Sequence, residues 1–170
     1  TFLWIWFEPI LLYFSIGYGL GSFVPDMNGL SYAEFFLPSV LAMTSMMVAF
    51  VEASYGNFLK IHQSGVFSSM LTTSLDVNQI VIGEILWAAT KGTLSTIGVA
   101  LAAAFFGHIT NPNYIFVFIV LFVNSIFFAA LGFYFAATIK NTDSLMIPTS
   151  LLLVPMSLLS GTYFSLDQAP

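Results

Sequence analysis

The sequence has 170 residues, of which 58% are hydrophobic and only 6% are charged, whereas an ordinary soluble domain is about 25% charged. Its net charge of -5 comes from eight acidic residues against three lysines, with no arginine, so the chain lacks the basic surface that nucleic-acid binding needs. It has no cysteine, which excludes disulfides and thiolate metal sites. We therefore interpret it as an all-α integral membrane protein.

The chain has room for about five spans of about 20 residues, and we expect one membrane domain over residues 1–170. It begins at Thr1 inside an apolar run and stops at Pro170 shortly after another such run. We therefore expect the sequence to be a fragment that is truncated at both ends.

The first predicted span begins near Pro9 and ends before Pro25. Trp4 and Trp6, beside Glu8, suit a belt at the membrane interface, and a proline in the first turn of a helix costs no hydrogen bond. Interfacial solvation is the favoured role for Glu8, and a contact with a partner helix is the alternative.

Within this span, Gly17 and Gly21 form a small-xxx-small pair, which predicts the close approach of another helix. The second predicted span covers Phe35 to Val51, with Pro38 in its first turn. Glu52 follows directly and is expected at the cytoplasmic interface, with a contact to a partner helix as the alternative.

Three further spans are predicted at residues 80–107, 114–137 and 144–160. The polar pair Asn124-Ser125 interrupts the fourth span, where interhelical hydrogen bonds are favoured over substrate ligation. Pro148 and Pro155 in the fifth span predict a kinked helix packed against protein, because prolines free backbone groups.

Lysine placement predicts the orientation. Lys60, Lys91 and Lys140 fall on or beside the loops after the second and fourth spans, while residues 25–34 and 107–113 contain no lysine. The positive-inside rule makes the lysine-bearing loops cytoplasmic. An even number of spans then requires a sixth one beyond the end of this sequence.

The long polar stretch between spans two and three, residues 52–91, predicts two helices. The first covers residues 55–71 with an imperfect apolar stripe and lies along the inner membrane face. Asp76 and Gln79 read as an N-cap and its partner three residues later, so the third membrane helix opens at about Val77. A surface helix joined to a spanning helix by a capped turn predicts a docking surface.

Glu84, Trp87 and Lys91 follow at helical spacing. Glu84 and Lys91 are too far apart for the usual i,i+4 pair, and Lys91 can extend toward the headgroups. Anchoring at the membrane interface is favoured for these residues, and a coupling role is the alternative.

No catalytic or cofactor site is visible in the sequence. It contains no GxxxxGK[ST], HExxH or GxSxG motif. His62 and His108 fall on opposite sides of the membrane in the predicted topology and cannot share a metal ion.

Four strings carry a resemblance to a known family. FEPILLYFSIGYGLG, FVEASYGNFLKI, MLTTSLDVNQIVIGEILWAATKG and LLSGTYFSLDQAP resemble the permease subunits of ABC-2 type exporters, closest to the branch that exports lipo-oligosaccharide nodulation signals and polysaccharides. The resemblance implies six helices per subunit, a homodimer in the lipids of a bacterial inner membrane, and a separate ATP-binding subunit. ATP and Mg²⁺ would bind that partner, with no cofactor on this chain.

The resemblance also assigns roles to residues. The loop from Gly56 to Leu75 corresponds to the coupling helix, which contacts the ATP-binding subunit. Its expected contact residues, with the following cap, are Phe58, Lys60, His62, Phe67, Met70, Leu71, Leu75 and Asp76. Glu52, Glu84, Trp87 and Lys91 are expected at the membrane interface or in coupling. An outer re-entrant segment would include Gly161, Phe164 and Asp167.

The sequence therefore predicts a permease subunit that moves a lipid-linked oligosaccharide, polysaccharide, lipid or drug-like amphiphile out of the cell. An ion-coupled secondary transporter or channel is the alternative, and it would need carboxylates or broken helices near mid-membrane. An intramembrane enzyme comes third, because no paired catalytic groups are present.

Overall fold

The computed structural model describes residues 2–23, 31–108 and 114–160, and all regular structure in these ranges is helical, as predicted. The α-helices are α1 (Phe2–Phe14), α2 (Tyr32–Val51), α3 (Asn57–His62), α4 (Val66–Met70), α5 (Val77–Phe105), α6 (Tyr114–Thr138), α7 (Met146–Pro148) and α8 (Val154–Leu159). Three π segments, η1 (Ser15–Leu20), η2 (Glu52–Gly56) and η4 (Thr149–Leu153), and one 3-10 segment, η3 (Thr142–Leu145), adjoin them.

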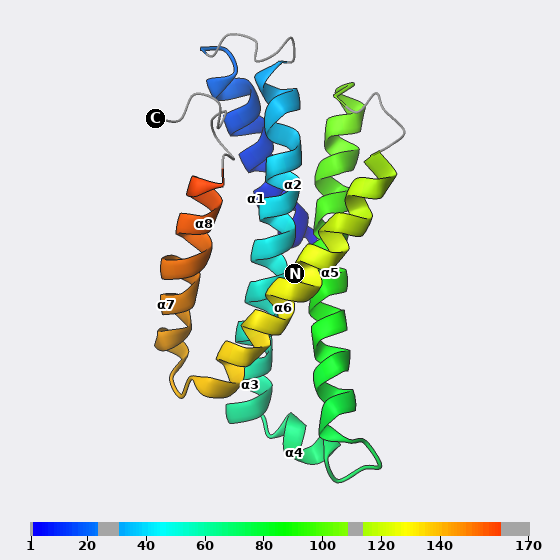
Figure 1. The fold of residues 1–170 in the computed structure, drawn as a ribbon, viewed down its shortest axis with the longest axis vertical. Coiled ribbons are helices and arrows are strands. Elements are labelled where there is room, and N and C mark those ends of the chain that lie inside the picture. Colours follow the sequence, from blue (N-terminus) through cyan, green and yellow to red (C-terminus); the bar gives the residue numbers. More distant parts are fainter. Residues whose placement is uncertain (1, 24–30, 109–113, 161–170) are drawn as a thin grey trace.

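Four helical segments in the described ranges are long and apolar enough to cross a membrane: Tyr32–His62, Val77–Phe105, Phe116–Thr138 and Thr142–Leu159. They run alternately down and up the bundle (Figure 1). The predicted second to fifth spans are therefore present. One end of the bundle carries α3, α4 and the start of α5. We use the name foot for residues 52–91, which pass through this end and continue to the middle of α5.

The first predicted span takes a different course. Its helix begins at Phe2, passes through Pro9 and continues as a π segment, and it starts about halfway along the bundle (Figure 1). The Trp6 indole N–H donates to the Leu94 carbonyl oxygen at 3.3 Å. The Trp6 ring fills the recess at Gly98, where an added Cβ would lie 2.9 Å from it. The predicted start at Pro9 is therefore wrong, and Trp6 packs against α5 at Leu94 and Gly98.

A capping box sets the start of α2. The Ser31 backbone N–H donates to Glu34 Oε2 at 2.9 Å, and the Glu34 N–H donates to Ser31 Oγ at 3.4 Å. The helix therefore opens at Tyr32 rather than Phe35, which moves Pro38 from the predicted first turn into the second. The Ser31-x-x-Glu34 spacing was readable in the sequence.

Small residues let α2, α5 and α6 approach closely. A Cβ added at Gly92 of α5 would lie 2.9 Å from both Ala49 Cβ of α2 and Ser125 Oγ of α6. Asn124 Nδ2 donates to Ser45 Oγ at 2.7 Å, linking α6 to α2. The predicted interhelical hydrogen bond is confirmed. These contacts form the small-residue core of the bundle.

Gly17 and Gly21 face the first turn of α2. A Cβ added at Gly17 would lie 3.5 Å from Ala33 Cβ, and one at Gly21 would lie 3.5 Å from Tyr32 Cβ. At both positions an added Cβ would meet α2 at ordinary van der Waals distance, so η1 lies against α2 near the end of the bundle opposite the foot, while at Gly21 the added Cβ would also clash with the Gly17 carbonyl oxygen.

The last described span is irregular, as its prolines predict. The π segment η4 begins directly after Pro148, and α8 starts at Val154 with Pro155 in its first turn. Leu145 and Leu153 are fully buried along this span. The predicted irregular backbone is therefore confirmed, whereas the predicted packing against protein is limited to one face, because Ile147, Leu151 and Leu159 are 56%, 74% and 75% exposed.

Candidate functional site

The foot is built on an extension of α2. This helix continues without a break through η2 and α3, giving 31 helical residues from Tyr32 to His62. Such a segment is about 46 Å long, whereas the hydrocarbon core of a bilayer is about 30 Å thick. The helix is therefore about 16 Å longer than the apolar layer is thick, and its last turns carry the polar residues Glu52, Asn57 and Lys60.

The extension ends at a sharp break. The backbone N–H groups of Gln63 and Ser64 both donate to the Leu59 carbonyl oxygen, and Gly65 adopts a left-handed conformation with φ of 62°. The predicted single helix over residues 55–71 is therefore wrong. Its first half belongs to the spanning helix, and only α4, residues 66–70, is a separate short helix.

Two ion pairs join this extension to α5, and they are the salt bridges found within the described residues. Lys60 Nζ lies 2.6 and 2.8 Å from the two carboxylate oxygens of Glu84. Lys91 Nζ lies 2.5 Å from Glu52 Oε1. We call the two pairs together the double clamp. Because each pair joins α5 to the α2 extension, the clamp braces the foot at two levels.

The clamp residues are only partly exposed. The Glu84 side chain is 12% exposed and that of Lys91 is 19% exposed. Lys91 Nζ also lies 5.1 Å from the centre of the Trp87 ring, within cation–π range. The expected headgroup anchors Glu84 and Lys91 thus have interhelical partners. Sequence reasoning missed these partners because they lie 24 and 39 residues away along the chain.

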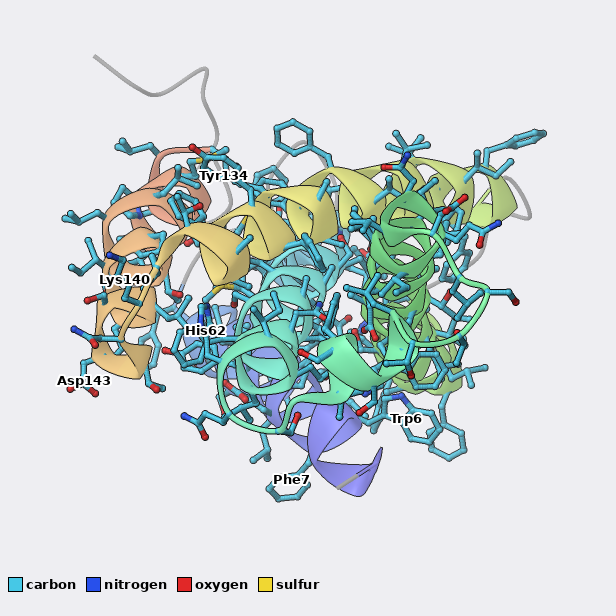
Figure 2. The ribbon with its side chains drawn as sticks, turned by 90° about the horizontal axis from the view of Figure 1, so that it is seen from below. Trp6, Phe7, His62, Tyr134, Lys140 and Asp143 are labelled. Atoms are coloured by element: carbon cyan, nitrogen blue, oxygen red, sulfur yellow. The ribbon has the colours of Figure 1, made fainter. Side chains whose placement is uncertain are left out.

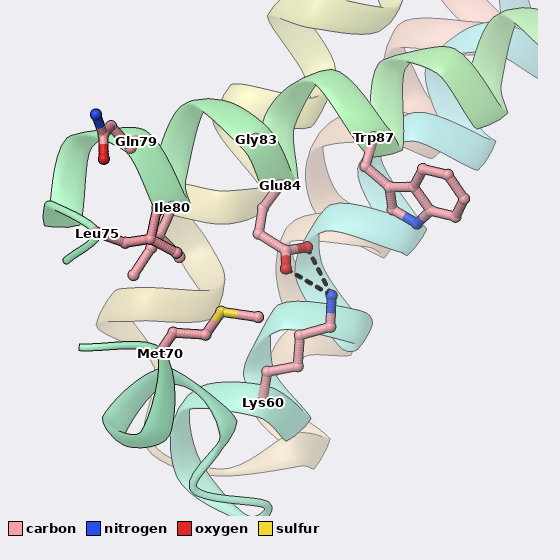
Figure 3. Close-up of a pocket in the computed structure, with 8 residues that line it drawn as sticks. All are labelled: Lys60, Met70, Leu75, Gln79, Ile80, Gly83, Glu84 and Trp87. Carbon is pink, nitrogen blue, oxygen red and sulfur yellow. Dashed lines mark hydrogen bonds and ion pairs between the residues drawn. The ribbon is translucent and has the colours of Figure 1, made fainter. Parts of the chain in front are cut away.

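A cavity of about 350 Å³ opens beside the lower pair of the clamp. Lys60 and Glu84 line one side, and Met70, Leu75 and Trp87 supply apolar surface (Figure 3). Met70 reaches in from α4 below the ion pair, while Leu75 lies beside Ile80 at the start of α5 (Figure 3). The short helix is thus seated against the clamp.

Three of the expected docking residues contact α6, and of these Phe58 is buried, Phe67 is partly buried and His62 remains exposed. Phe58 is 2% exposed and packs with Ala136 in a buried cluster. His62 Nε2 lies 3.3 Å from the Ala136 carbonyl oxygen, and the Phe67 ring centre lies 6.2 Å from that of Phe133. In this conformation Phe58 has no surface available for a direct contact with a partner.

Part of the exposed apolar surface of the foot lies on and directly after the turn that follows α4. Leu71, Leu75 and Val77 are 48%, 46% and 58% exposed, and we call these three residues the apolar rim. Asp76 between them is exposed, and its backbone N–H donates to the Gln79 side-chain oxygen at 3.1 Å. The predicted start of α5 at Val77 is confirmed. Val77 itself was not among the expected docking residues.

The two histidines lie at opposite ends of the bundle, as predicted. His108 Nδ1 lies 2.7 Å from the Tyr13 hydroxyl at the end away from the foot. Viewed from the foot, the exposed His62 lies inside the outline of the bundle, while Lys140 and Asp143 lie at the edge where α6 turns toward α7 (Figure 2). In the part of the chain that the structure describes, no three His, Cys, Asp or Glu side chains form a possible metal site. The predicted outer residues Gly161, Phe164 and Asp167 lie outside the described residues.

Membrane-length helices, the small-residue core and the braced foot define an all-helical, polytopic membrane protein. The family model described as ABC-2 type transporter matches residues 1–170, and the chain belongs to this family.

The chain is similar to several curated proteins. It is 32% identical over 163 residues to Nodulation protein J of Rhizobium leguminosarum bv. viciae, covering 96% of this chain and 63% of that protein. It is 31% identical over 163 residues to Nodulation protein J of Sinorhizobium fredii, and the match covers 96% of this chain and 62% of that protein. It is 24% identical over 177 residues to Inner membrane transport permease YadH of Escherichia coli, covering 99% and 69%. The chain thus spans about three fifths of the nodulation proteins' length. No solved structure was found to match it.

Proposed function

We propose that this chain is the membrane-spanning permease part of an ATP-driven exporter in the bacterial inner membrane. Two copies would enclose the pathway, and a separate ATP-binding subunit, which holds ATP and Mg²⁺, would drive it. Membership of the ABC-2 type transporter family supports the transport role. The name of one relative, Inner membrane transport permease YadH, supports a transport role. The cargo we propose, from the resemblance to exporters of lipo-oligosaccharide nodulation signals, is a lipid-linked oligosaccharide, a polysaccharide, a lipid or a drug-like amphiphile.

The observation that carries this proposal is the braced foot. The apolar rim and α4 adjoin an extension of α2, and the double clamp ties that extension to α5. A push on the rim by an ATP-binding subunit therefore reaches two spanning helices together. Since helices are stiff along their axes, the displacement would pass into the membrane without passing through a flexible linker.

An ion-coupled carrier is the second candidate, and one observation favours it. Such a carrier needs an ionisable group near the membrane midplane. Glu8 lies two residues from Trp6, which contacts the middle of α5. Transport that persists without ATP and collapses with the ion gradient would support the carrier and contradict the exporter.

The exporter is tested by placing a charge on the apolar rim. We predict that Leu75→Glu lowers ATP-dependent transport at least tenfold in the full-length protein with its ATP-binding subunit, reconstituted into liposomes. The reason is that docking would bury the new carboxylate without a partner, which costs about 1.4 kcal/mol or more, or a factor of at least ten in binding. The measurements are ATP-driven cargo uptake into these liposomes, with ATP added outside, and cargo-stimulated ATP hydrolysis.

Asn141→Glu is the matched control, because Asn141 is also exposed at this end of the bundle but lies outside the rim. It should transport at the parental rate. Phe67→Glu is less suitable as a test, because Phe67 packs on Phe133 and its loss would also disturb folding. Normal transport by well-inserted Leu75→Glu protein would show that the rim is not the docking surface.

A further inference from the structure

Glu8 occupies an unusual depth for a carboxylate. The hydrocarbon core takes about 20 residues of a helix, and counted back from Phe105 this places the midplane close to Ser95 of α5. Trp6 bonds to the Leu94 carbonyl oxygen, and Glu8 lies only about 3 Å further along α1. The exposed Glu8 side chain has no ion-pair partner within the described residues. An unpaired charge at this depth is expensive, and such residues normally have a specific partner.

A cavity of about 320 Å³ adjoins Glu8 between α1 and α2, and we call it the α1–α2 cavity. Its walls are largely apolar and include Leu12, Met43, Met47 and Val51. The volume falls within the range of small-molecule sites, and methionines adapt to ligands of varied shape. Along α2 the cavity extends from Met43 to Glu52, about 13 Å, which is long enough for a short alkyl chain.

We propose that the α1–α2 cavity binds an amphiphile that carries one ammonium group, with the ammonium on the Glu8 carboxylate and the apolar part along Met43, Met47 and Val51. The site goes beyond the proposed transport function and does not depend on ATP. The amine would come either from a lipid headgroup or from a free amphiphilic compound.

The charges of the cavity select this ligand class. The carboxylates that line it belong to Glu8 and Glu52, and Glu52 already pairs with Lys91. Glu8 therefore supplies the charge that remains to be neutralised, and an anionic amphiphile would be repelled. A bare inorganic cation would neutralise Glu8 but leave the apolar walls without a partner. An ammonium with an apolar body satisfies both features of the site.

Binding is measured directly on the full-length protein, without ATP, in dodecyl maltoside micelles. The probe is tritiated tetraphenylphosphonium, detected by scintillation proximity, and the competitor is dodecylamine. Because dodecyl maltoside has the same alkyl tail without a charge and is already in excess, competition reports the ammonium. We expect saturable binding that Glu8→Gln weakens at least tenfold. Glu52→Gln should weaken it less, because Lys91 already neutralises Glu52.

Two further variants separate binding in the cavity from unspecific effects of a substitution. Met47→Trp fills the cavity while retaining Glu8, and it should also weaken binding at least tenfold. Asp143→Asn removes an exposed carboxylate at the η3 edge, away from the cavity, and should bind like the parent. Unchanged binding in folded Glu8→Gln or Met47→Trp protein would overturn the proposal. So would dodecylamine that displaces the probe no better than added dodecyl maltoside.

The source of the amine is resolved by lipid competition. Added phosphatidylethanolamine that displaces the probe, while phosphatidylglycerol does not, identifies the site as a lipid-headgroup site. Displacement by dodecylamine alone identifies a site for free amphiphilic amines. Displacement by phosphatidylglycerol as readily as by either amine would contradict the charge selection.

Discussion

The foot and the small-residue core hold the same helices together by different forces. In the core, Gly92 lets backbone and side-chain atoms meet at van der Waals distance, so added atoms have no room. In the foot, the double clamp holds α5 to the α2 extension by charge. Coulomb attraction falls off slowly with distance, whereas steric contact is lost or becomes repulsive within an ångström. The comparison teaches that the core fixes the spacing of the helices by steric fit, whereas the foot is tied to α5 by charge, which tolerates small changes in distance.

The largest effect is expected from crowding the core. Gly92→Ala should destabilise the protein by about 1–3 kcal/mol, because the new Cβ would lie 2.9 Å from Ala49 Cβ, Ser125 Oγ and the Ser45 carbonyl oxygen. The measurement is the apparent melting temperature of the purified protein. Gly83→Ala is the matched control on the same helix, since nothing lies within 4 Å of its added Cβ. It should be neutral or raise the melting temperature, because alanine favours helix. Equal effects at the two positions would remove the basis for a sterically fixed core.

Substitutions in the double clamp should lower the free energy of unfolding by less than crowding the core does. A double-mutant cycle with Lys60→Met and Glu84→Gln should give a coupling energy of about 1 kcal/mol in unfolding, low because Lys60 is 33% exposed. The exchanged pair, Lys60→Glu with Glu84→Lys, should recover part of the stability lost in either single exchange. The cycle is measured at low and high salt, and the coupling should weaken as salt rises. Strictly additive single effects would mean that the pair does not brace the foot.

Loss of the hydrogen bond between Asn124 and Ser45 in the core should have the smallest effect on stability. Asn124→Ala removes the hydrogen bond to Ser45, and such bonds between membrane helices contribute about 0.6 kcal/mol on average. Adding Ser45→Ala to Asn124→Ala should lower the stability little further, because the hydrogen bond between the two residues is already lost. Unfolding in a denaturing detergent measures both variants. A large loss of transport without loss of stability would instead assign Asn124 to the cargo.

The sequence predicted most of the fold because its signals are local. The Asp76-x-x-Gln79 spacing marks the start of α5, and the proline pair in the last described span marks its irregular backbone. The start of α2 was placed three residues late because the Ser31-x-x-Glu34 cap was not used. The depth of α1 could not be read from its composition, since Trp6 suits a membrane interface as well as the recess at Gly98.

The candidate site was harder to predict because its contacts join distant parts of the chain. Lys60, Glu84 and Lys91 were identified as important, but no periodicity pairs residues on two antiparallel helices. The sequence also does not show which of the expected docking residues are buried and which are exposed. Phe58 and Leu71 are both apolar, and only the packing of α6 against α3 buries one of them.

The π segment η2 sets the rotational register of the clamp. On α5, Glu84 and Lys91 are seven residues apart, which is close to two full turns, so they face the same side. On the other helix, Glu52 and Lys60 are eight residues apart, and in a regular α-helix they would point about 80° away from each other. A π turn absorbs one extra residue. With η2 between them, Glu52 and Lys60 return to a common face, and both partners meet α5. The five residues of η2 thus rotate Lys60 relative to Glu52, so that the two charged residues on this helix line up with Glu84 and Lys91 on α5.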